Sequence, residues 1–330
     1  MQIESCYHVT QHQSLSLNMP LTSDSRTLDI ASKLVDRLRE GAGTPKAYRP
    51  AHAKGHLVKG TFKPTAEAAS LSKAPHFNNA STPFVTRFSV STGLPTISDK
   101  DEKAGPRGLA IRFLLSEDGH QHTDIIGHST AHFPVATGEG FLALLHASAN
   151  GVFDEFLQGS AAADAFFKIS IPHPESFLTE QWFMVNAFKF VNADGQEKCG
   201  RYRVVPEQYL TLSGEELKGK SDSYLFEDLE ERLGKGPVTL KLVVQIAEDG
   251  DVTDDATMRW PDSRELVEVG SLVLETFVKT DESHKEQQKI IFDPIPRVAG
   301  IEPSADPILE VRAAVYLISG RIRREAQKSM

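Results

Sequence analysis

Alternating apolar and polar positions dominate the middle of the chain and predict β-strands. The alternation runs through six segments bounded by turn-forming residues, at 56–64, 83–90, 107–115, 182–191, 201–205 and 238–247. In the last segment one face of the two-residue repeat is aliphatic and carries Val238, Leu240, Leu242, Val244 and Ile246. Residues 192–195 (Asn-Ala-Asp-Gly) predict a hairpin turn between two runs, because Asn, Asp and Gly tolerate a positive φ.

Apolar residues at helical spacing predict four helices. Three of them cover residues 27–43, 138–149 and 224–234. The fourth starts at Asp306, whose carboxylate can cap free N–H groups, and Pro307, which fits the first helical position. Its apolar stripe consists of Ile308, Val311, Val315, Ile318 and Ile322. Arg312, Tyr316 and Arg323 lie on an adjacent stripe, with Arg312 one turn before the phenol.

The arrangement of these segments predicts the fold class. Hairpin-spaced strands and helices that do not alternate with them favour an α+β fold with an antiparallel sheet, most economically a closed β-barrel. No internal repeat or low-complexity linker divides the chain. We therefore predict one domain over residues 26–330, preceded by a flexible leader, residues 1–25, rich in Gln, Ser and Thr.

The charge balance and the cysteines restrict the possible partners and compartments. The 330 residues carry a formal net charge of −9 without a basic patch, which disfavours binding to nucleic acid or anionic lipid. No apolar run approaches the ~18 residues that a membrane span needs, and the start lacks a secretory signal pattern. Cys6 and Cys199 match neither a disulfide framework nor a cysteine zinc site. A cytoplasmic protein is the expectation.

The Arg312–Tyr316 pair has a possible chemical use. A phenol has an ordinary pKa of about 10, so it needs a nearby cation to become a phenolate at neutral pH. A phenolate is a hard anionic ligand for ferric iron and is one of the axial haem ligands found in proteins. Arg323, about 10 Å further along the helix, would suit a haem propionate.

A histidine-rich segment supports a different class of function. His120, His122, Asp124, His128 and His132 fall within thirteen residues, and residues two apart on a strand share a face. A His-x-His pair on a barrel could bind a divalent metal in the manner of a cupin. The expected later carboxylate and histidine do not follow at a convincing distance, and a turn beside Asp118-Gly119 explains the pair as well.

Several segments together resemble the haem catalases in the same order along the chain. The proximal haem-ligand phrase of that family is similar to residues 300–323, with the pattern Arg312-x-x-x-Tyr316 followed by Arg323. The other similar segments are 49–55 (distal histidine), 86–89 and 106–113 (strands), 124–133 (distal loop), and 260–275 with 290–294, which lead to the proximal helix. The resemblance covers roughly residues 45–325 and implies a barrel of about eight strands with a C-terminal proximal haem-binding helix.

The resemblance implies a role for each matching residue. His52 would be the distal base, oriented by Ser89, and would move a proton between the two oxygens of a bound hydroperoxide. Tyr316 would be the axial ligand to the iron of haem b, with its phenolate stabilised by Arg312. The propionates would be held by Arg49, Arg87 and Arg323, and the distal walls would come from Phe133 and Phe141.

Departures from the family pattern shape the expected activity. His128 stands where fully active catalases carry a distal Asn, which puts fast dismutation in doubt; the ring could donate a hydrogen bond or turn away and leave Ser129 nearby. The chain ends at Met330, so no NADPH site and no interlocked tetramer are expected, and a homodimer is more plausible. The expected function is a haem b peroxidase that uses hydrogen peroxide or organic hydroperoxides with a small reductant, through an oxoferryl intermediate, with weak catalase activity.

Two haem-based alternatives stay open at this point. Related enzymes rearrange fatty acid hydroperoxides or oxidise specialised metabolites, but one rearranging branch carries Thr before the distal histidine, where this chain has Ala51. A barrel that merely stores or senses haem or fatty acid would not need a distal base and a proximal arginine together. The peroxidase interpretation therefore accounts for more of the residues.

Overall fold

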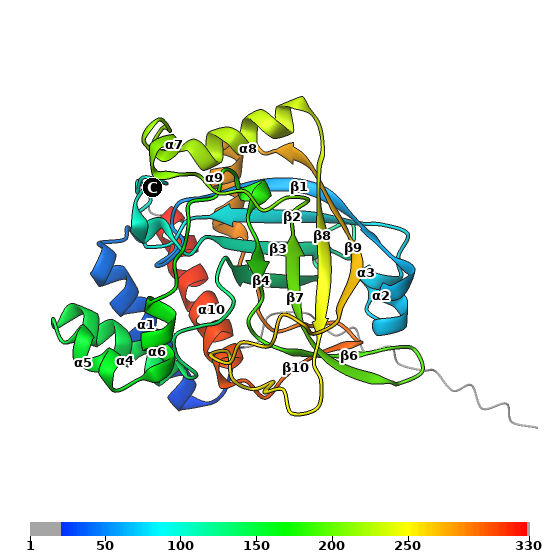
Figure 1. Ribbon diagram of the computed structural model, residues 1–330, viewed down its shortest axis with the longest axis horizontal. Helices are drawn as coiled ribbons and strands as arrows, with labels where there is room; N and C mark the ends of the chain where they lie inside the picture. Colours follow the sequence, from blue (N-terminus) through cyan, green and yellow to red (C-terminus); the bar gives the residue numbers. More distant parts are fainter. Residues whose placement is uncertain (1–20, 329–330) are drawn as a thin grey trace, which may run out of the picture.

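Antiparallel strands close into a barrel at the centre of the molecule (Figure 1). The computed structural model describes residues 21–328. Within that range eight strands pair in the order β7-β5-β4-β3-β2-β1-β9-β8, and β8 pairs again with β7 to complete the ring. Strands β6 and β10 extend outward from β7. The predicted α+β fold with a closed antiparallel barrel is confirmed.

The strands vary widely in length. Their bounds are β1 (Gly55–Pro64), β2 (Thr82–Ser89), β3 (Gly108–Leu114), β4 (His122–His128), β5 (Trp182–Phe183), β6 (Phe188–Val191), β7 (Glu197–Val205), β8 (Val238–Ile246), β9 (Leu266–Phe277) and β10 (Ile301–Pro303). The predicted hairpin at residues 192–195 joins β6 to β7, and Gly195 has the positive φ (79°) that the turn requires. On β8 the predicted aliphatic face is buried in the barrel core.

Ten α-helices accompany the strands in the described range. They are α1 (Ser25–Ala42), α2 (Ala66–Leu71), α3 (Pro75–Asn78), α4 (Gly138–Ala149), α5 (Phe153–Gln158), α6 (Ala161–Phe167), α7 (Gly214–Lys218), α8 (Tyr224–Lys235), α9 (Thr280–Lys289) and α10 (Pro307–Lys328). The four predicted helices correspond to α1, α4, α8 and α10. Helix α10 begins as predicted, with the Asp306 carboxylate accepting the Ile308 N–H at 3.0 Å. The predicted leader, 1–25, lies mostly outside the described residues, and α1 starts at Ser25.

Two sequence interpretations of strand structure were wrong, and one strand was not predicted. The segment ending at His128 was taken as loop, but it forms β4, paired along its whole length with β3. Residues 266–277, which overlap the segment 260–275 that leads toward the last helix, were not predicted as a strand and form the longest one, β9. The run 182–191 is not one strand, because residues 184–187 leave the ladder between β5 and β6. Pairing with distant strands decided each case, and local alternation does not reveal it.

The barrel strands have two different faces. Alternate residues of β2, β3 and β4 point into a dense aromatic and aliphatic core that includes Phe84, Phe88, Leu109, Ile111, Phe113 and Ile125. The residues between them face outward, toward the side of the barrel where α1, α4 and α10 pack on one another (Figure 1). No helix in residues 21–328 is long and apolar enough to cross a membrane.

Helix α10 borders both the barrel core and a cavity, and its apolar side chains divide accordingly. Leu309 and Ala313 join the barrel core, whereas Ile308, Val311 and Val315 line the cavity. Half-buried Ile318 and Ile322 complete the predicted stripe. Three of the five stripe residues therefore line the cavity and none belongs to the barrel core, which is contacted by a different side of the helix.

Candidate functional site

A cavity of about 260 Å³ lies outside the barrel, between the outer face of β2–β4 and the helices α1, α4 and α10. Its walls bring together segments that are far apart in the sequence. All ten residues singled out from the sequence line it, namely Arg49, His52, Arg87, Ser89, His128, Phe133, Phe141, Arg312, Tyr316 and Arg323. The placement agrees with the expected site, while the chemical role of each residue stays a prediction.

His52 is held in an unusual backbone conformation next to Ser89. Its φ of 54° lies in the left-handed region, which costs a non-glycine residue roughly 1–2 kcal/mol and persists only where neighbours hold it. The Ser89 hydroxyl lies 3.3 Å from His52 Nδ1 and 3.3 Å from the Gly108 carbonyl oxygen. A Cβ on Gly108 would lie 2.7 Å from Ser89 Oγ and 2.8 Å from His52 Nδ1, so this close approach requires glycine.

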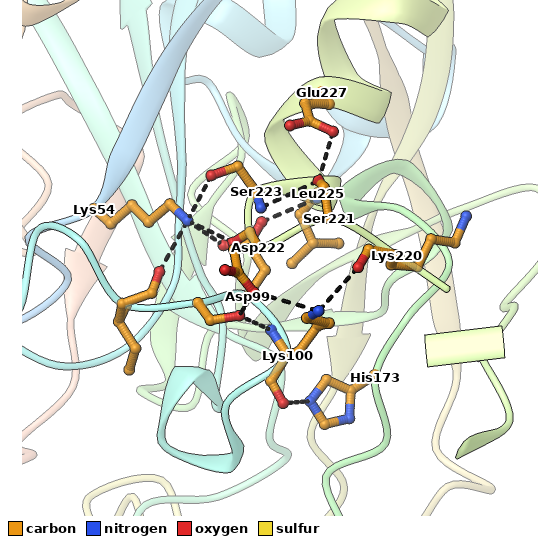
Figure 2. A network of polar contacts seen from close by, with 12 residues as sticks. Lys54, Asp99, Lys100, His173, Lys220, Ser221, Asp222, Ser223, Leu225 and Glu227 are labelled. Atoms are coloured by element: carbon orange, nitrogen blue, oxygen red, sulfur yellow. Dashed lines mark hydrogen bonds and ion pairs between the residues drawn. The ribbon is translucent and has the colours of Figure 1, made fainter. Parts of the chain in front are cut away.

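Two cationic side chains, buried Arg87 and partly buried Lys54, fix the loop that carries His52. Arg87 donates to the carbonyl oxygens of His52 (2.9 Å) and Ala53 (3.2 Å). Two residues after the histidine, Lys54 reaches the Asp99 carboxylate at 2.8 Å, and it also donates to Ser223 Oγ and to two backbone carbonyls (Figure 2). Asp99 in turn accepts the Leu225 N–H at the start of α8. The loop is therefore tied to the barrel on one side and to α8 on the other.

The environment of His52 keeps its imidazole neutral. Burial, followed by the positive charge of Arg87, lowers the pKa of His52 from 6.5 to about 4. The charges of Arg312 and Arg49 act in the same direction. At pH values well above 4 the ring therefore has a free lone pair and can accept a proton, which is the property that a general base needs.

His128 ends β4 and faces the same cavity. Its Nδ1 lies 2.7 Å from the Thr130 hydroxyl and 3.3 Å from the Thr130 backbone N. Burial, and then the charge of Arg312, lowers the pKa of His128 to about 3. The following residue does not enter the cavity, because Ser129 exchanges hydrogen bonds with the Arg107 backbone. Of the two arrangements considered from the sequence, the structure has the ring in the cavity.

Three arginines gather at one end of the cavity. Arg49 donates to the Gln287 and Ile290 carbonyls, Arg87 donates through Nε to Gln287 Oε1 at 2.7 Å, and Arg323 donates to Ser319 Oγ and the Ile290 carbonyl. Within residues 21–328 their hydrogen bonds go to neutral oxygens and none reaches a carboxylate.

Burial and mutual repulsion act on all three guanidiniums. The pKa of Arg87 falls to about 9 and that of Arg323 to about 8, chiefly through burial, and the pKa of Arg49 is also well below its usual range. Arg323 Nε is buried and without a partner in the described part of the chain. A buried cluster of cations that lacks carboxylates suits a ligand with anionic groups.

Tyr316 belongs to a chain of polar contacts on the α10 side of the cavity. Arg312 Nη2 lies 3.2 Å from the Tyr316 hydroxyl oxygen, and Nη1 donates to the Asn186 side-chain oxygen. The Asn186 amide donates to the Asp306 carboxylate at 2.7 Å. Asp306 is the residue that caps α10. Asn186, in the segment between β5 and β6, and Asp306, the cap of α10, thus set the position of the Arg312 guanidinium over the Tyr316 ring.

Apolar side chains cover much of the remaining cavity surface. Phe133 and Phe141 lie with ring centroids 5.3 Å apart, and Phe133 is 6.2 Å from the His128 ring. Leu34 and Leu38 of α1 add to this wall. A flat aromatic cofactor with charged groups at one edge fits such a lining, because the apolar walls and the arginine cluster occupy different parts of the cavity.

The histidine-rich segment does not form a metal centre. His120 is exposed in a turn, with its backbone N–H bonded to Asp118. His122 Nδ1 is 3.2 Å from the Gly119 carbonyl, and Asp124 is paired with Arg112. No group of three His, Cys, Asp or Glu side chains in residues 21–328 is placed to hold a metal ion. The cupin-like alternative was wrong, since the segment turns through a bend before β4 begins.

Sequence reasoning missed several residues that complete the site. Asn186 was read as a strand position, and Gln287 belongs to α9, which was not predicted. The polar composition of 280–289 hides this helix, because its few buried positions are Ser283, Gln287 and Gln288. Thr130 and Gly108 gave no signal of their own. Their contacts depend on which strands pair, not on local pattern.

Comparisons with known proteins identify the family of this chain. A sequence model of the family described as Catalase matches residues 45–328. A "Catalase-related peroxidase" of Mycolicibacterium paratuberculosis is 34% identical over 300 residues, which cover 88% of this chain and 93% of the relative. A protein of the same name from Synechococcus elongatus is 31% identical over 290 residues, 84% of each chain. Helix α1 precedes the matched range.

Solved structures share the fold. A fungal catalase superposes with a TM-score of 0.74 at 23% identity, over 90% of this chain and 63% of the other. Catalase A from Saccharomyces cerevisiae gives a TM-score of 0.73 at 22% identity, over 88% and 64%. This chain therefore spans less than two thirds of the length of these two structures.

Proposed function

This chain belongs to the catalase family, and we propose that it is a haem b peroxidase that reduces organic hydroperoxides or hydrogen peroxide with a small-molecule reductant. The observation that carries the proposal is the convergence in one cavity of His52, Tyr316 and the arginine cluster, from positions more than 260 residues apart. Members of the family normally bind haem. Two relatives that this chain matches over more than four fifths of its length are named as peroxidases.

The residues of the cavity fit haem b. The Tyr316 oxygen would bind the iron, since a phenolate is a hard anionic ligand and Arg312 lies within hydrogen-bonding distance of it. The propionates would be held by Arg49, Arg87 and Arg323, whose buried charges meet no carboxylate among residues 21–328. Phe133 and Phe141 would contact the apolar surface on the distal side.

When bound, ferric haem would supply the Lewis acid and redox centre at which the O–O bond breaks. The chain itself would manage the proton. His52 Nε2 takes the proton from the hydroperoxide oxygen nearer the cofactor and delivers it to the farther oxygen, which leaves as water or an alcohol. Ser89 fixes the ring through Nδ1, and the left-handed backbone at His52 sets the direction from which the ring enters the cavity.

The replacement at position 128 supports a peroxidase with weak catalase activity. A side-chain amide offers a donor and an acceptor on a small planar group, whereas the His128 ring occupies more of the distal space. Dismutation needs a second hydrogen peroxide to enter and be oxidised. A bulkier ring beside His52 disfavours that step more than it disfavours delivery of electrons from a reductant.

The proposal is tested by giving the haem-loaded protein four substrate mixtures. They are hydrogen peroxide alone, hydrogen peroxide with a phenolic reductant, cumene hydroperoxide with the same reductant, and a polyunsaturated fatty acid hydroperoxide without reductant. Reductant oxidation with little oxygen release is the expected result. Rapid oxygen release from hydrogen peroxide alone would overturn the peroxidase assignment in favour of a catalase. Conversion of the lipid hydroperoxide to an epoxide or cyclic product would favour a rearranging enzyme.

A further inference from the structure

The hydrogen bonds around His128 determine which of its ring nitrogens carries a proton. The Thr130 backbone N–H lies 3.3 Å from Nδ1, and a backbone N–H can only donate. The Thr130 hydroxyl lies closer, 2.7 Å from the same nitrogen, and 3.4 Å from the His132 carbonyl. The backbone N–H favours an unprotonated Nδ1, to which the Thr130 hydroxyl then donates the shorter and stronger hydrogen bond, so that removing the hydroxyl leaves only the long backbone contact to hold this form.

The other nitrogen of the His128 ring, Nε2, is available to a ligand in the cavity. Burial, with the charges of Arg312 and His52 next in size, holds the pKa of His128 near 3, so the ring is neutral at ordinary pH. A neutral imidazole with an unprotonated Nδ1 carries its hydrogen on Nε2. Nε2 is buried and has no hydrogen-bond partner among residues 21–328, and the side chain lines the cavity. A buried N–H without a partner is costly unless a ligand accepts it.

His52 has the opposite arrangement. Ser89 Oγ lies 3.3 Å from the Gly108 carbonyl oxygen, to which the hydroxyl can donate, and its lone pair can then accept from His52 Nδ1–H. His52 thereby presents an unprotonated Nε2, whereas His128 presents an N–H. One cavity wall holds a proton acceptor and a hydrogen-bond donor, each set by a hydroxyl behind its ring.

We propose that Thr130 is a positioning residue that holds His128 in the Nε2–H form, so that His128 donates a hydrogen bond to the hydroperoxide from which His52 takes its proton. This inference rests on the proposed peroxidase function. The oxygen that loses its proton to His52 gains negative charge, and the His128 N–H stabilises it without transferring a proton, because a neutral imidazole is a very weak acid. No proton or electron beyond those of the peroxidase reaction is required.

The first test uses NMR to determine which nitrogen of the His128 ring carries the hydrogen. The full chain is labelled with 15N in histidine and loaded with gallium(III) protoporphyrin IX, a diamagnetic substitute for ferric haem. The His128 signals are assigned by their loss in His128→Asn. We expect long-range 1H–15N correlations typical of the Nε2–H form in the unsubstituted protein and in Thr130→Ser, and a loss of that single form in Thr130→Val. An Nδ1–H signature for His128 in the unsubstituted protein would overturn the proposal.

The second test measures the hydrogen bond that His128 donates, through the affinity of the haem-loaded protein for cyanide. Cyanide enters as hydrogen cyanide and leaves its proton on a base, here His52. The bound cyanide then accepts a hydrogen bond at its nitrogen, here from His128. Its affinity for the haem-loaded protein therefore depends on both imidazoles. Loss of a well-placed donor in Thr130→Val should weaken cyanide binding about fivefold, with Thr130→Ser within about twofold of the unsubstituted protein. Equal affinities in all three proteins would refute the positioning role.

The two proposals fail in different ways. If the protein retained no porphyrin, the proposed function would fail, whereas the ring signals of the porphyrin-free full chain would still test the Thr130–His128 contact. If the protein acted as a peroxidase but His128 kept one tautomer in Thr130→Val, only the positioning role would fail.

Discussion

The two faces of β2, β3 and β4 form the clearest contrast in the molecule. The inner face carries side chains such as Phe84, Ile111 and Phe113, which pack in one continuous barrel core. The outer face of the same strands carries Arg87, Ser89 and His128, which line the cavity. Because successive side chains of a strand point to opposite sides, adjacent residues serve stability and chemistry separately.

The contrast teaches how a rigid site is assembled. Inner-face residues find their partners within the barrel and gain stability from burial. The polar outer-face residues depend on groups from elsewhere in the chain: Arg87 on Gln287 of α9, and Ser89 on the loop that carries His52. Substitutions on the inner face should therefore change folding, and those at the cavity should change reaction or ligand binding.

Removing the imidazole of His52 should give the largest effect and leave the fold unchanged. We expect His52→Ala to lower kcat/KM for peroxide by about 100- to 10,000-fold, because general acid–base assistance is lost. The melting temperature should stay near that of the unsubstituted protein, since alanine keeps the left-handed backbone that neighbouring groups already hold and the change removes one side-chain contact, to Ser89. Stopped-flow kinetics and calorimetry provide the two measurements.

Exposed His146 on α4 is the matched control for His52. His146→Ala should retain full activity. A His52→Ala protein with activity within a factor of ten of the original would show that the cavity does not use this ring as its base.

Truncation on the inner face should have the reverse effect. Phe113 is fully buried and contacts Phe62 and His76, so Phe113→Ala should lower the free energy of unfolding by about 3–5 kcal/mol. The folded fraction should retain the haem spectrum. Urea unfolding followed by circular dichroism measures the loss, with Phe167→Ala, at a ring 45% exposed on α6, as the control. A loss below 1 kcal/mol, or one equal to that of the control, would contradict the assignment of Phe113 to the core.

Replacing Asn186 should affect both the stability of the protein and the cavity, each by an intermediate amount. Asn186→Ala leaves the Asp306 carboxylate and the Arg312 guanidinium without the amide that joins them. We expect a loss of about 1–3 kcal/mol in unfolding free energy, together with a shift of the haem absorption bands as Arg312 moves relative to Tyr316. Asn150→Ala, at the exposed end of α4, should change neither property. Unaltered absorption in Asn186→Ala would mean that the amide has no influence on the phenol.

Acid should weaken the barrel core through His76 of α3, whose ring stacks on Phe113, and this is the smallest of the predicted effects per pH unit. His76 is fully buried and burial lowers its pKa from 6.5 to about 3. Between these values the unfolded chain binds a proton that the folded chain does not, so unfolding free energy falls as pH decreases, by at most about 1.4 kcal/mol per unit. His76→Phe should flatten the dependence of melting temperature on pH between 6.5 and 4.5. An unchanged slope would show that this ring does not resist protonation.

The same contrast explains how much could be predicted from sequence. The barrel, the helices α1, α4, α8 and α10, and the hairpin at 192–195 follow from periodicity and turn residues, which are local properties. The ten site residues were found through ordered similarity to a family, and the structure places them around one cavity. Local pattern could not reveal Asn186, Gln287 or Thr130, because each becomes significant only through a partner brought close by strand pairing or helix packing. It also failed for β4, whose outward residues belong to the cavity.

The central claim is that the Tyr316 oxygen binds haem iron in this cavity, and absorption spectroscopy after hemin supplementation tests it most directly. Tyr209, 45% exposed, provides the matched control. The unsubstituted protein and Tyr209→Phe should retain about one haem per chain with a Soret band characteristic of phenolate ligation, whereas Tyr316→Phe should lose most of its haem on gel filtration. A colourless unsubstituted protein, or Tyr316→Phe with unchanged haem content and spectrum, would contradict the account.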